Sequence, residues 1–504
     1  MTHTRRFSRP PRFAPDRRVL AVALALLASA CSVGPDYHRP ATSAGDNFTA
    51  RPLPESTAAA DVKGGASQHW AKGQDIPAQW WHAFHSPSLD ALIKEAFAAN
   101  PNVRAAQAAL RQANDMVWAQ RGYFLPSIQA GFAPSRQKNP VGTLAPTLSS
   151  GVPIYNLYTA QLSVGYTLDV FGGNRRQVES LIAQADMQRF ELEATYLTLS
   201  TNVVLAAVQE AALRAQIAAT ERMIAIESEQ LQIMMKEVDL GAIAVSDATA
   251  QEVLLAQTAA LLPPLRKQLA VQRDALAALL GRLPAEDPAE TFDLDKIELP
   301  LDLPLSLPSA IVEHRPDVRA AEEQLHYASA QVGVAIADML PQITFSASGG
   351  GTSTAFSRMF AAGNKFWSVG ANLSQTLFDG GTLYFHERAA VDALDVAGAQ
   401  YRGAVITAFQ NVADTLHALV FDADALKANV DAERSAERSL AYARKAQELG
   451  SVSYLAMLNA EQAYLQAVVN RVQAQANRYA DTAALFQALG GGWWNRDAAE
   501  TAQR

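Results

Sequence analysis

Residues 158–173 read YTAQLSVGYTLDVFGG, and this stretch decides the fold. Apolar side chains take every second place from Tyr158 to Leu168, and small or polar residues take the places between them. Such alternation is typical of a β-strand with one apolar and one polar face. The Gly-Gly pair then ends the strand. The pattern fits a membrane barrel strand that borders a wet lumen, and it fits a soluble hairpin with one buried face equally well.

Three further segments complete the expected β region. In the second half, apolar residues again take alternate places: Trp367, Val369, Ala371 and Leu373. Partner strands begin at Ser127 and Gln342, so strands are expected near 127–137, 157–169, 342–349 and 366–377. Loops rich in Gly, Ser and Pro lie between them, around 138–156 and 349–365. After residue 31 no apolar run approaches the roughly 20 residues of a transmembrane helix, so any membrane crossing would need a closed barrel.

The chain repeats itself at a spacing of about 210 residues. The heptapeptide NPNVRAA at 100–106 returns as RPDVRAA at 315–321. Further landmarks return in the same order: Leu125-Pro126 as Leu340-Pro341, Gly172-Gly173 as Gly380-Gly381, Leu240-Gly241 as Leu449-Gly450, and Leu280-Gly281 as Leu489-Gly490. We therefore expect two copies of one helix-strand-strand-helix-helix unit, at 89–283 and 307–490, joined by an irregular connector at 284–306.

Each copy contains a very long helical segment, at about 174–240 and 382–449. Apolar residues recur with helical spacing in the second: Val405, Ala408, Val412, Leu416, Leu419, Ala423, Leu426 and Val430. In the first they recur every seven places: Ile217, Ile224, Leu231 and Val238. Both patterns predict coiled-coil packing. Gly241 and Gly450 suit left-handed helix ends, and Ser453 suits the start of a return helix. Before the strands, helices are expected at about 89–124 and 317–339, the latter after a short helix near 307–314.

Cys31 is the only cysteine. A basic leader, an apolar run at 19–27 and small residues before Cys31 predict that residues 1–30 are a lipoprotein signal peptide. The mature chain would then begin at a lipid-bearing Cys31, with an extended segment at 31–88 and a tail at 491–504; a plain signal peptide with an incidental cysteine is the alternative. Residues 1–30 carry six Arg and one Asp, so their removal changes the net charge from −8 to −13, which argues against nucleic-acid binding.

Several motifs together resemble the TolC-like outer membrane factors of efflux pumps, most closely the NodT-type lipoprotein subgroup. They are CSVGPDY at 31–37, WW at 80–81, RPDVRAAE at 315–322, FDGG at 378–381 and LGGGW at 489–493. The resemblance implies a mainly helical fold with a membrane β part. In a homotrimer, each chain would give four strands to one twelve-stranded barrel, and the helices would form an α-barrel tunnel. It implies the outer membrane channel of a tripartite, RND-type efflux system for drugs or other small molecules, with a periplasmic adaptor and an inner-membrane transporter as partners.

The resemblance also implies three sets of site residues. The adaptor-contact tips would be Leu240, Gly241, Asp247, Leu449, Gly450 and Ser453. The periplasmic gate would be Tyr454, Leu455 and Asn459; Asn459 stands where some relatives have Asp, and a neutral ring cannot bridge cations. The lipid-facing residues would be Tyr158, Leu162, Val164, Trp367 and Leu373. For Leu455, ordinary coiled-coil core is the alternative interpretation.

Motifs for enzyme chemistry are absent from the sequence: it contains no nucleophile elbow, phosphate loop or zinc-protease motif. His82 and His85 lack neighbouring acidic ligands in the sequence and are expected to pack the N-terminal segment, not to bind a metal. No catalytic residue or cofactor is expected, apart from the lipid on Cys31. The expected location is the outer membrane, with the chain reaching into the periplasm. A channel for type I protein secretion and a pore-less periplasmic coiled-coil scaffold remain alternatives.

Overall fold

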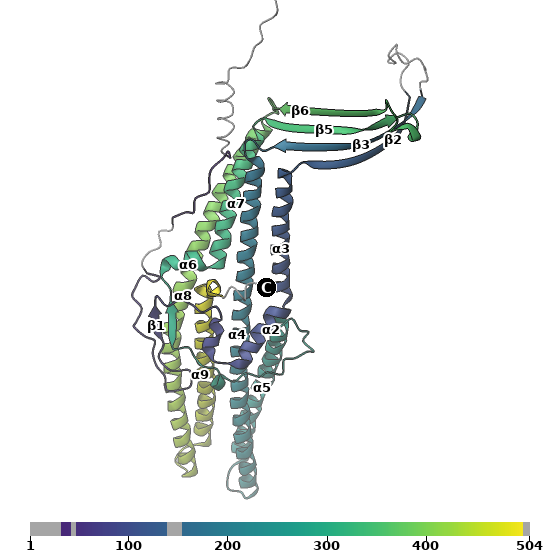
Figure 1. The fold of residues 1–504 in the computed structure, drawn as a ribbon. Coiled ribbons are helices and arrows are strands. Elements are labelled where there is room, and N and C mark those ends of the chain that lie inside the picture. The colour runs from purple at the N-terminus through teal and green to yellow at the C-terminus, as the bar shows by residue number, and fades with distance from the viewer. Residues whose placement is uncertain (1–31, 42–46, 139–153, 497–504) are drawn as a thin grey trace, which may run out of the picture. The chain divides into compact units, whose positions relative to one another are not determined.

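A computed structural model of the chain describes residues 32–41, 47–138 and 154–496, which form two compact units (Figure 1). The first unit comprises Met1–His38, Gln112–Ala185 and Gln324–Gly398, and it contains the long strands. The second comprises Arg39–Arg111, Asp186–Glu323 and Ala399–Arg504, and it contains the helical hairpins. The expected signal peptide, Cys31 and the end of the tail lie outside the described residues.

The described elements follow the same order in both halves of the chain. The helices are α2 (Pro87–Ala99), α3 (Pro101–Arg121), α4 (Gly173–Asp239), α5 (Val245–Leu279), α6 (Pro308–His314), α7 (Pro316–Asp338), α8 (Thr382–Glu448) and α9 (Tyr454–Ala488). The strands are β1 (His69–Lys72), β2 (Ser127–Lys138), β3 (Ile154–Leu168), β4 (Asp302–Leu305), β5 (Gln342–Ser353) and β6 (Lys365–Ser374). Each half therefore has two helices, two long strands, a 67-residue helix and a 35-residue helix.

The prediction of a single helix at 89–124 is wrong, because Asn100 divides this segment into α2 and α3. Asn100 has an extended backbone, with φ −61° and ψ 127°. Pro101 follows it, and a proline disfavours helical geometry in the residue before it. Arg315 and Pro316 divide α6 from α7 in the same way. The first copy therefore has the helix pair that was expected only of the second.

The segments before and between the copies are more ordered than expected. Within 31–88, β1 pairs in parallel with β4, which lies in the expected irregular connector. A short 3-10 helix at Trp80–Phe84 buries its aromatic rings. The buried Arg478 of α9 donates hydrogen bonds to the Ala66 carbonyl at 2.6 Å and to the Thr57 hydroxyl at 2.9 Å. The second unit thus wraps its N-terminal segment around a buried cation.

The four long strands of the first unit form one antiparallel sheet in the order β2-β3-β5-β6. Directly paired residues present their side chains on the same face. Gly349 of β5 pairs with Leu162 of β3 and with Trp367 of β6. By alternation, the same face carries Tyr158, Val164 and Leu373. Strand β5 continues through Gly349, where a loop was expected, because strands on both sides supply hydrogen-bonding partners.

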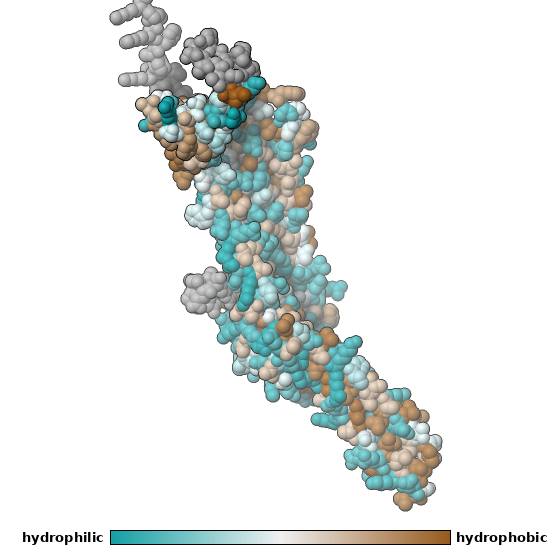
Figure 2. Space-filling model, turned by 90° about the vertical axis from the view of Figure 1, so that its right-hand side faces the viewer, coloured by the Kyte–Doolittle hydropathy of each residue, from teal (hydrophilic) through white to brown (hydrophobic). Residues whose placement is uncertain are grey.

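Three of the five residues predicted to face lipid are exposed in the described chain, and Tyr158 and Val164 are half-buried. Trp367 is 80% exposed, Leu373 68% and Leu162 56%. Figure 2 shows brown apolar residues over the strand region. The opposite face carries mainly small and polar residues, such as Gln129, Gln161 and Ser163. The first unit therefore differs from a soluble hairpin, whose apolar face would be buried.

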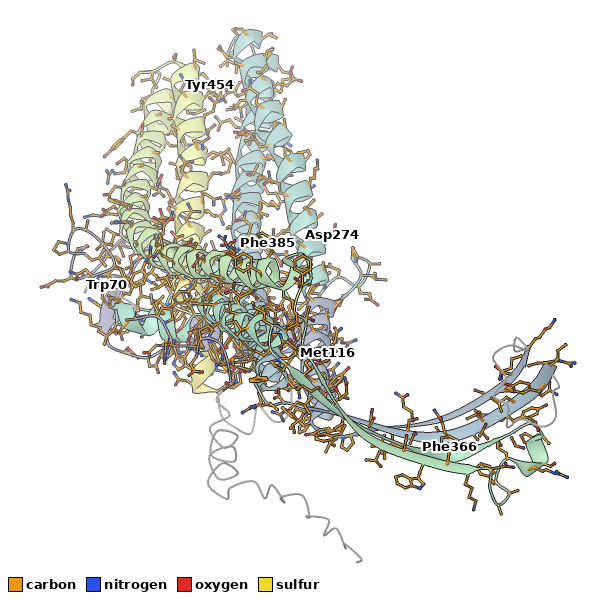
Figure 3. All side chains as sticks on the ribbon, turned by 90° about the horizontal axis from the view of Figure 1, so that it is seen from above. Trp70, Met116, Asp274, Phe366, Phe385 and Tyr454 are labelled. Carbon is orange, nitrogen blue, oxygen red and sulfur yellow. The ribbon has the colours of Figure 1, made fainter. Side chains whose placement is uncertain are left out.

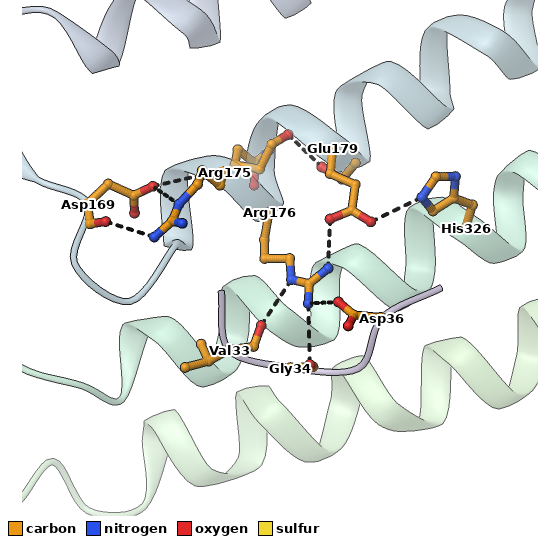
Figure 4. A network of polar contacts seen from close by, with 10 residues as sticks. Val33, Gly34, Asp36, Asp169, Arg175, Arg176, Glu179 and His326 are labelled. Atoms are coloured by element: carbon orange, nitrogen blue, oxygen red, sulfur yellow. Dashed lines mark hydrogen bonds and ion pairs between the residues drawn. The ribbon is translucent and has the colours of Figure 1, made fainter. Parts of the chain in front are cut away.

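A buried arginine at the start of α4 holds the N-terminal segment of the first unit (Figure 4). Arg176 donates hydrogen bonds to the carbonyl oxygens of Val33 and Gly34 at 3.0 and 3.3 Å, and it pairs with Asp36 at 2.7 Å. A side chain on Gly34 would collide with the backbone of Gly333 in α7. Residues 32–36 are therefore docked against the first unit.

Both hairpin tips of the second unit are built by left-handed glycines, as predicted. Gly241 has φ 72° and Gly450 has φ 70°. The Gly450 N–H donates to the Gln447 carbonyl at 2.9 Å, and the Ser451 N–H donates to the Ala446 carbonyl at 2.8 Å. These two bonds define a Schellman motif, which satisfies the last carbonyls of α8. The first tip repeats the pattern, so each long helix ends where the sequence indicated.

The coiled-coil pattern is confirmed in α8 and displaced in α4. From Ala408 to Val430, the predicted α8 residues are buried. The predicted α4 residues, from Ile217 to Val238, are only half-buried. Between residues 216 and 238 of α4, the buried residues are instead Gln216, Thr220, Met223, Glu227 and Met234. Three of these are polar, so hydropathy alone does not reveal the buried stripe.

By length and hydropathy alone, α4 and α8 could each cross a membrane, which the sequence analysis did not expect. The most apolar 18-residue window of each reaches a mean hydropathy of 1.2. The α4 window is 61% buried within the described chain and the α8 window 22%. Core helices of soluble proteins also reach such values, so the windows alone do not identify membrane spans.

Candidate functional site at the hairpin tips

The two hairpins of the second unit end in exposed apolar side chains. Leu240 is 83% exposed and Leu449 is 70% exposed, one at each tip. Figure 2 shows brown patches at this end of the second unit. Asp247 is half-buried in the first turn of α5, and Ser453 is exposed at the start of α9. Ser453 is the N-cap residue, as predicted, but its side chain makes no capping hydrogen bond.

The structure separates the three residues that were expected to form one gate. Leu455 is 63% exposed and Asn459 is exposed one turn later, so the two share a free face of α9. Tyr454, which lies near the end of its hairpin (Figure 3), is half-buried. Its hydroxyl group donates a 2.5 Å hydrogen bond to Gln251 of α5. Tyr454 therefore joins the two hairpins, and only Leu455 and Asn459 remain available for a ring.

A small apolar cluster lies beneath Tyr454. Leu254 of α5 packs with Met457 and Leu458 of α9, and all three are buried. Ala250 and Ala443 border the cluster. Leu455 lies outside this cluster and is exposed in the described chain.

Behind this cluster, buried polar groups link the two helices within each hairpin, and Gln251, which accepts from Tyr454, connects one hairpin to the other. Glu227 of α4 and Glu461 of α9 are each 1% exposed. The Thr258 hydroxyl of α5 donates to Glu227 at 3.0 Å, and Arg444 of α8 pairs with Glu461 at 2.8 Å. The Gln251 amide donates to the Glu227 carbonyl oxygen at 2.9 Å. The hairpins thus share buried charge as well as apolar packing.

This network is incompletely satisfied. One carboxylate oxygen of Glu227, one of Glu461 and the Nε of Arg444 are buried and have no hydrogen-bond partner among the described residues. Burial raises the pKa of Glu227 from 4.5 to about 7; the Thr258 hydrogen bond opposes this rise and the charge of Glu461 adds to it. The sequence analysis missed Glu227 and Glu461, because a lone carboxylate on a long helix usually faces solvent. The sequence signal that could have identified them is helical spacing: Glu227 follows the buried Met223 by four residues, and Glu461 follows the buried Leu458 by three.

The two histidines considered as metal ligands point to different carboxylates. His82 lies 3.5 Å from Asp90, and His85 lies 3.4 Å from Glu298. Acidic groups therefore lie closer to the histidines than the sequence indicated, but each histidine contacts a different carboxylate, and the two do not share a ligand. No cluster of three or more potential metal ligands occurs in the ranges that the structure describes.

The chain matches the family described as "Outer membrane efflux protein" over residues 92–282 and 307–491. It is 30% identical to "Toluene efflux pump outer membrane protein TtgF" of Pseudomonas putida, over 94% of this chain and 97% of that protein. It is 28% identical to "Pyoverdine export outer membrane protein OpmQ" of Pseudomonas putida, over 88% and 94% of the two chains. The solved outer-membrane channel OprN matches the fold with a TM-score of 0.80 at 27% identity, over 92% of this chain and all of that one.

Proposed function

Because this chain belongs to the outer membrane efflux protein family, we propose that three copies of it close into one transmembrane barrel. The chain is the outer membrane channel of a tripartite efflux pump and not an enzyme. Three copies of a four-stranded sheet would give a twelve-stranded barrel. The helices would then surround a tunnel through which cargo passes from the periplasm to the exterior.

The open sheet of the first unit carries this proposal. Within the described residues, β2 and β6 each have one unpaired edge. Unpaired backbone groups cannot remain inside a bilayer, so the edges must pair with those of other chains. The apolar face would contact lipid, and the polar face would line the lumen. The apolar windows of α4 and α8 are assigned to helix packing, because a spanning sheet leaves these helices no need to cross the membrane.

The proposed cargo is small molecules, for which the names of the relatives, toluene and pyoverdine export proteins, are the support. The test compares cells that lack this chain with cells that express it. Loss of the channel should raise the accumulation of a fluorescent dye or a solvent and leave secreted proteins at their usual level. Unchanged accumulation together with a loss of one secreted protein would instead support the type I secretion alternative.

The proposed attachment to the membrane includes a lipid on Cys31. Its support is the sequence before Cys31 and the docking of residues 32–36 by Arg176. We predict that mass spectrometry of the mature N-terminal peptide finds Cys31 as its first residue and finds acyl chains on it. An unmodified thiol or cleavage elsewhere would contradict the prediction. The Cys31→Ser variant should keep its fold, because the barrel would still anchor the trimer.

The proposed partner at the tips is a periplasmic adaptor, together with an inner-membrane transporter behind it. The exposed Leu240 and Leu449 would contact the adaptor, and the exposed face of Leu455 and Asn459 would line the closed tunnel end. In a trimer this face recurs three times around one axis. Adaptor binding would then shift the hairpins between a packed and a splayed arrangement.

We predict that Leu455→Ala opens the resting channel, because it removes the apolar part of that ring. Single-channel conductance in planar bilayers should rise, and cells should become more sensitive to large antibiotics. Val452→Ala, at another partly exposed apolar position near the same tip, is the matched control. Normal conductance in Leu455→Ala, at normal trimer levels, would place the gate elsewhere.

A further inference from the structure

The hairpin pair contains more buried acid than buried base near its tips. Glu227 and Glu461 bring two carboxylates, and Arg444 brings the guanidinium that pairs with one of them. If both carboxylates are ionised, one negative charge remains uncompensated in the interior. Burying such a charge is costly, and a carboxyl group in that position takes up a proton instead.

In the part of the chain that the structure describes, no second cation pairs with Glu227 or Glu461. From α5, Thr258 and Gln251 face Glu227, and both are neutral. From α9, Glu461 faces Glu227, and the Tyr454 hydroxyl contacts Gln251. Asp247 of α5 adds a further negative charge near Tyr454. Protonation of Glu227 is therefore the one change that balances the charge with the hairpins packed.

We infer that Glu227, buried beside Glu461, is a proton-dependent latch, which holds the two hairpins together when Glu227 is protonated and releases them when it loses its proton. This inference rests on the proposed channel function, and it adds regulation by pH to the proposed gate. Glu227 is bonded to α5 and Glu461 to α8, and the two carboxyl groups interact electrostatically between the hairpins. Its opening would let water reach the carboxylates as the hairpins separate.

The direction of the effect follows from the pKa of Glu227. The packed state holds this pKa at about 7, against 4.5 in water. A raised carboxyl pKa favours the packed state at low pH, and the benefit is lost as the pH rises through 7. Between pH 6 and pH 8, the ratio of open to closed channels should rise about tenfold.

The test is single-channel recording of the full-length trimer in planar bilayers between pH 5.5 and 8.5. In wild type, the ratio of open to closed channels should rise with pH and level off above about pH 7. Glu227→Gln cannot ionise and should stay mostly closed at every pH. Glu229→Gln, which removes an exposed carboxylate two residues away on α4, should keep the wild-type response. Thr258→Val removes a hydrogen bond that favours the charged form, so the pH at which its response levels off should be higher than in wild type.

Three outcomes separate the possibilities. Conductance that ignores pH in wild type would overturn the latch and leave the channel intact. Absence of conductance in every variant would instead contradict the proposed function. Burial, together with the neighbouring Asp422, also raises the pKa of Asp481 in α9 to about 7. A pH response that survives in Glu227→Gln and disappears in Asp481→Asn would therefore assign the switch to Asp481 and Asp422.

Discussion

Replacing Arg444 by alanine should destabilise the hairpin pair by about 3 kcal/mol, because it leaves Glu461 buried without its partner. The range for a fully buried pair is about 3–5 kcal/mol, and the lower end applies because the Arg444 side chain is 37% exposed. Thermal unfolding of the helices, followed by circular dichroism in detergent, measures the effect.

Glu461→Gln provides the control for this prediction. In Arg444→Ala with Glu461→Gln, no charge is left unpaired at that place, so much of the lost stability should return. A second control is Arg438→Ala, which removes an exposed arginine of the same helix. Equal destabilisation in Arg444→Ala and Arg438→Ala would show that the pair with Glu461 contributes little.

Leu162→Arg should prevent most of the chain from entering the membrane, at a cost of about 2–4 kcal/mol for a charge at mid-bilayer on the lipid face. Leu162 lies within β3 on the exposed apolar face. The same substitution one residue earlier, Gln161→Arg, points to the opposite face and into the proposed lumen. The fraction of chain recovered from outer membranes as heat-stable trimer measures insertion.

The contrast between these two neighbours is what the prediction depends on. Gln161→Arg should give nearly wild-type amounts of trimer, because a charge in a wet lumen keeps its water. Equal recovery of both variants would mean that the assignment of faces is wrong. Low recovery of both would indicate that arginine disturbs β3 itself, and Leu162→Ala then tests the lipid face without a charge.

The architecture could be predicted because its signals repeat. The Leu-Gly pairs at the helix ends each require a left-handed backbone, and both tips confirmed it. The α8 stripe could be predicted because its buried residues are apolar. The α4 stripe could not, because Gln216, Thr220 and Glu227 hold buried positions with polar side chains. Their burial depends on partners in other helices, which periodicity along one helix does not reveal.

The candidate site was predictable in part for the same reason. Leu455 lies in the first turn of α9, four residues before Asn459, so helical spacing alone places these two exposed residues on one face. The inward turn of Tyr454 depends on Gln251, which lies 203 residues earlier in the chain. A motif that places Tyr454 beside Leu455 describes only neighbours along the helix. The contact that separates their roles comes from α5 of the first hairpin.

The number of strands in the sheet has a consequence for symmetry. Strands β2, β3, β5 and β6 alternate in direction, so β2 and β6 at the two edges run oppositely. Because four is even, β6 of one copy meets β2 of the next in antiparallel fashion, whatever the number of copies in the ring. Parity alone would therefore accept two, three or four copies. The angle at which helices of neighbouring copies pack must then decide among these numbers. The number of copies in the pore would therefore be set by the helical part of the protein, outside the membrane.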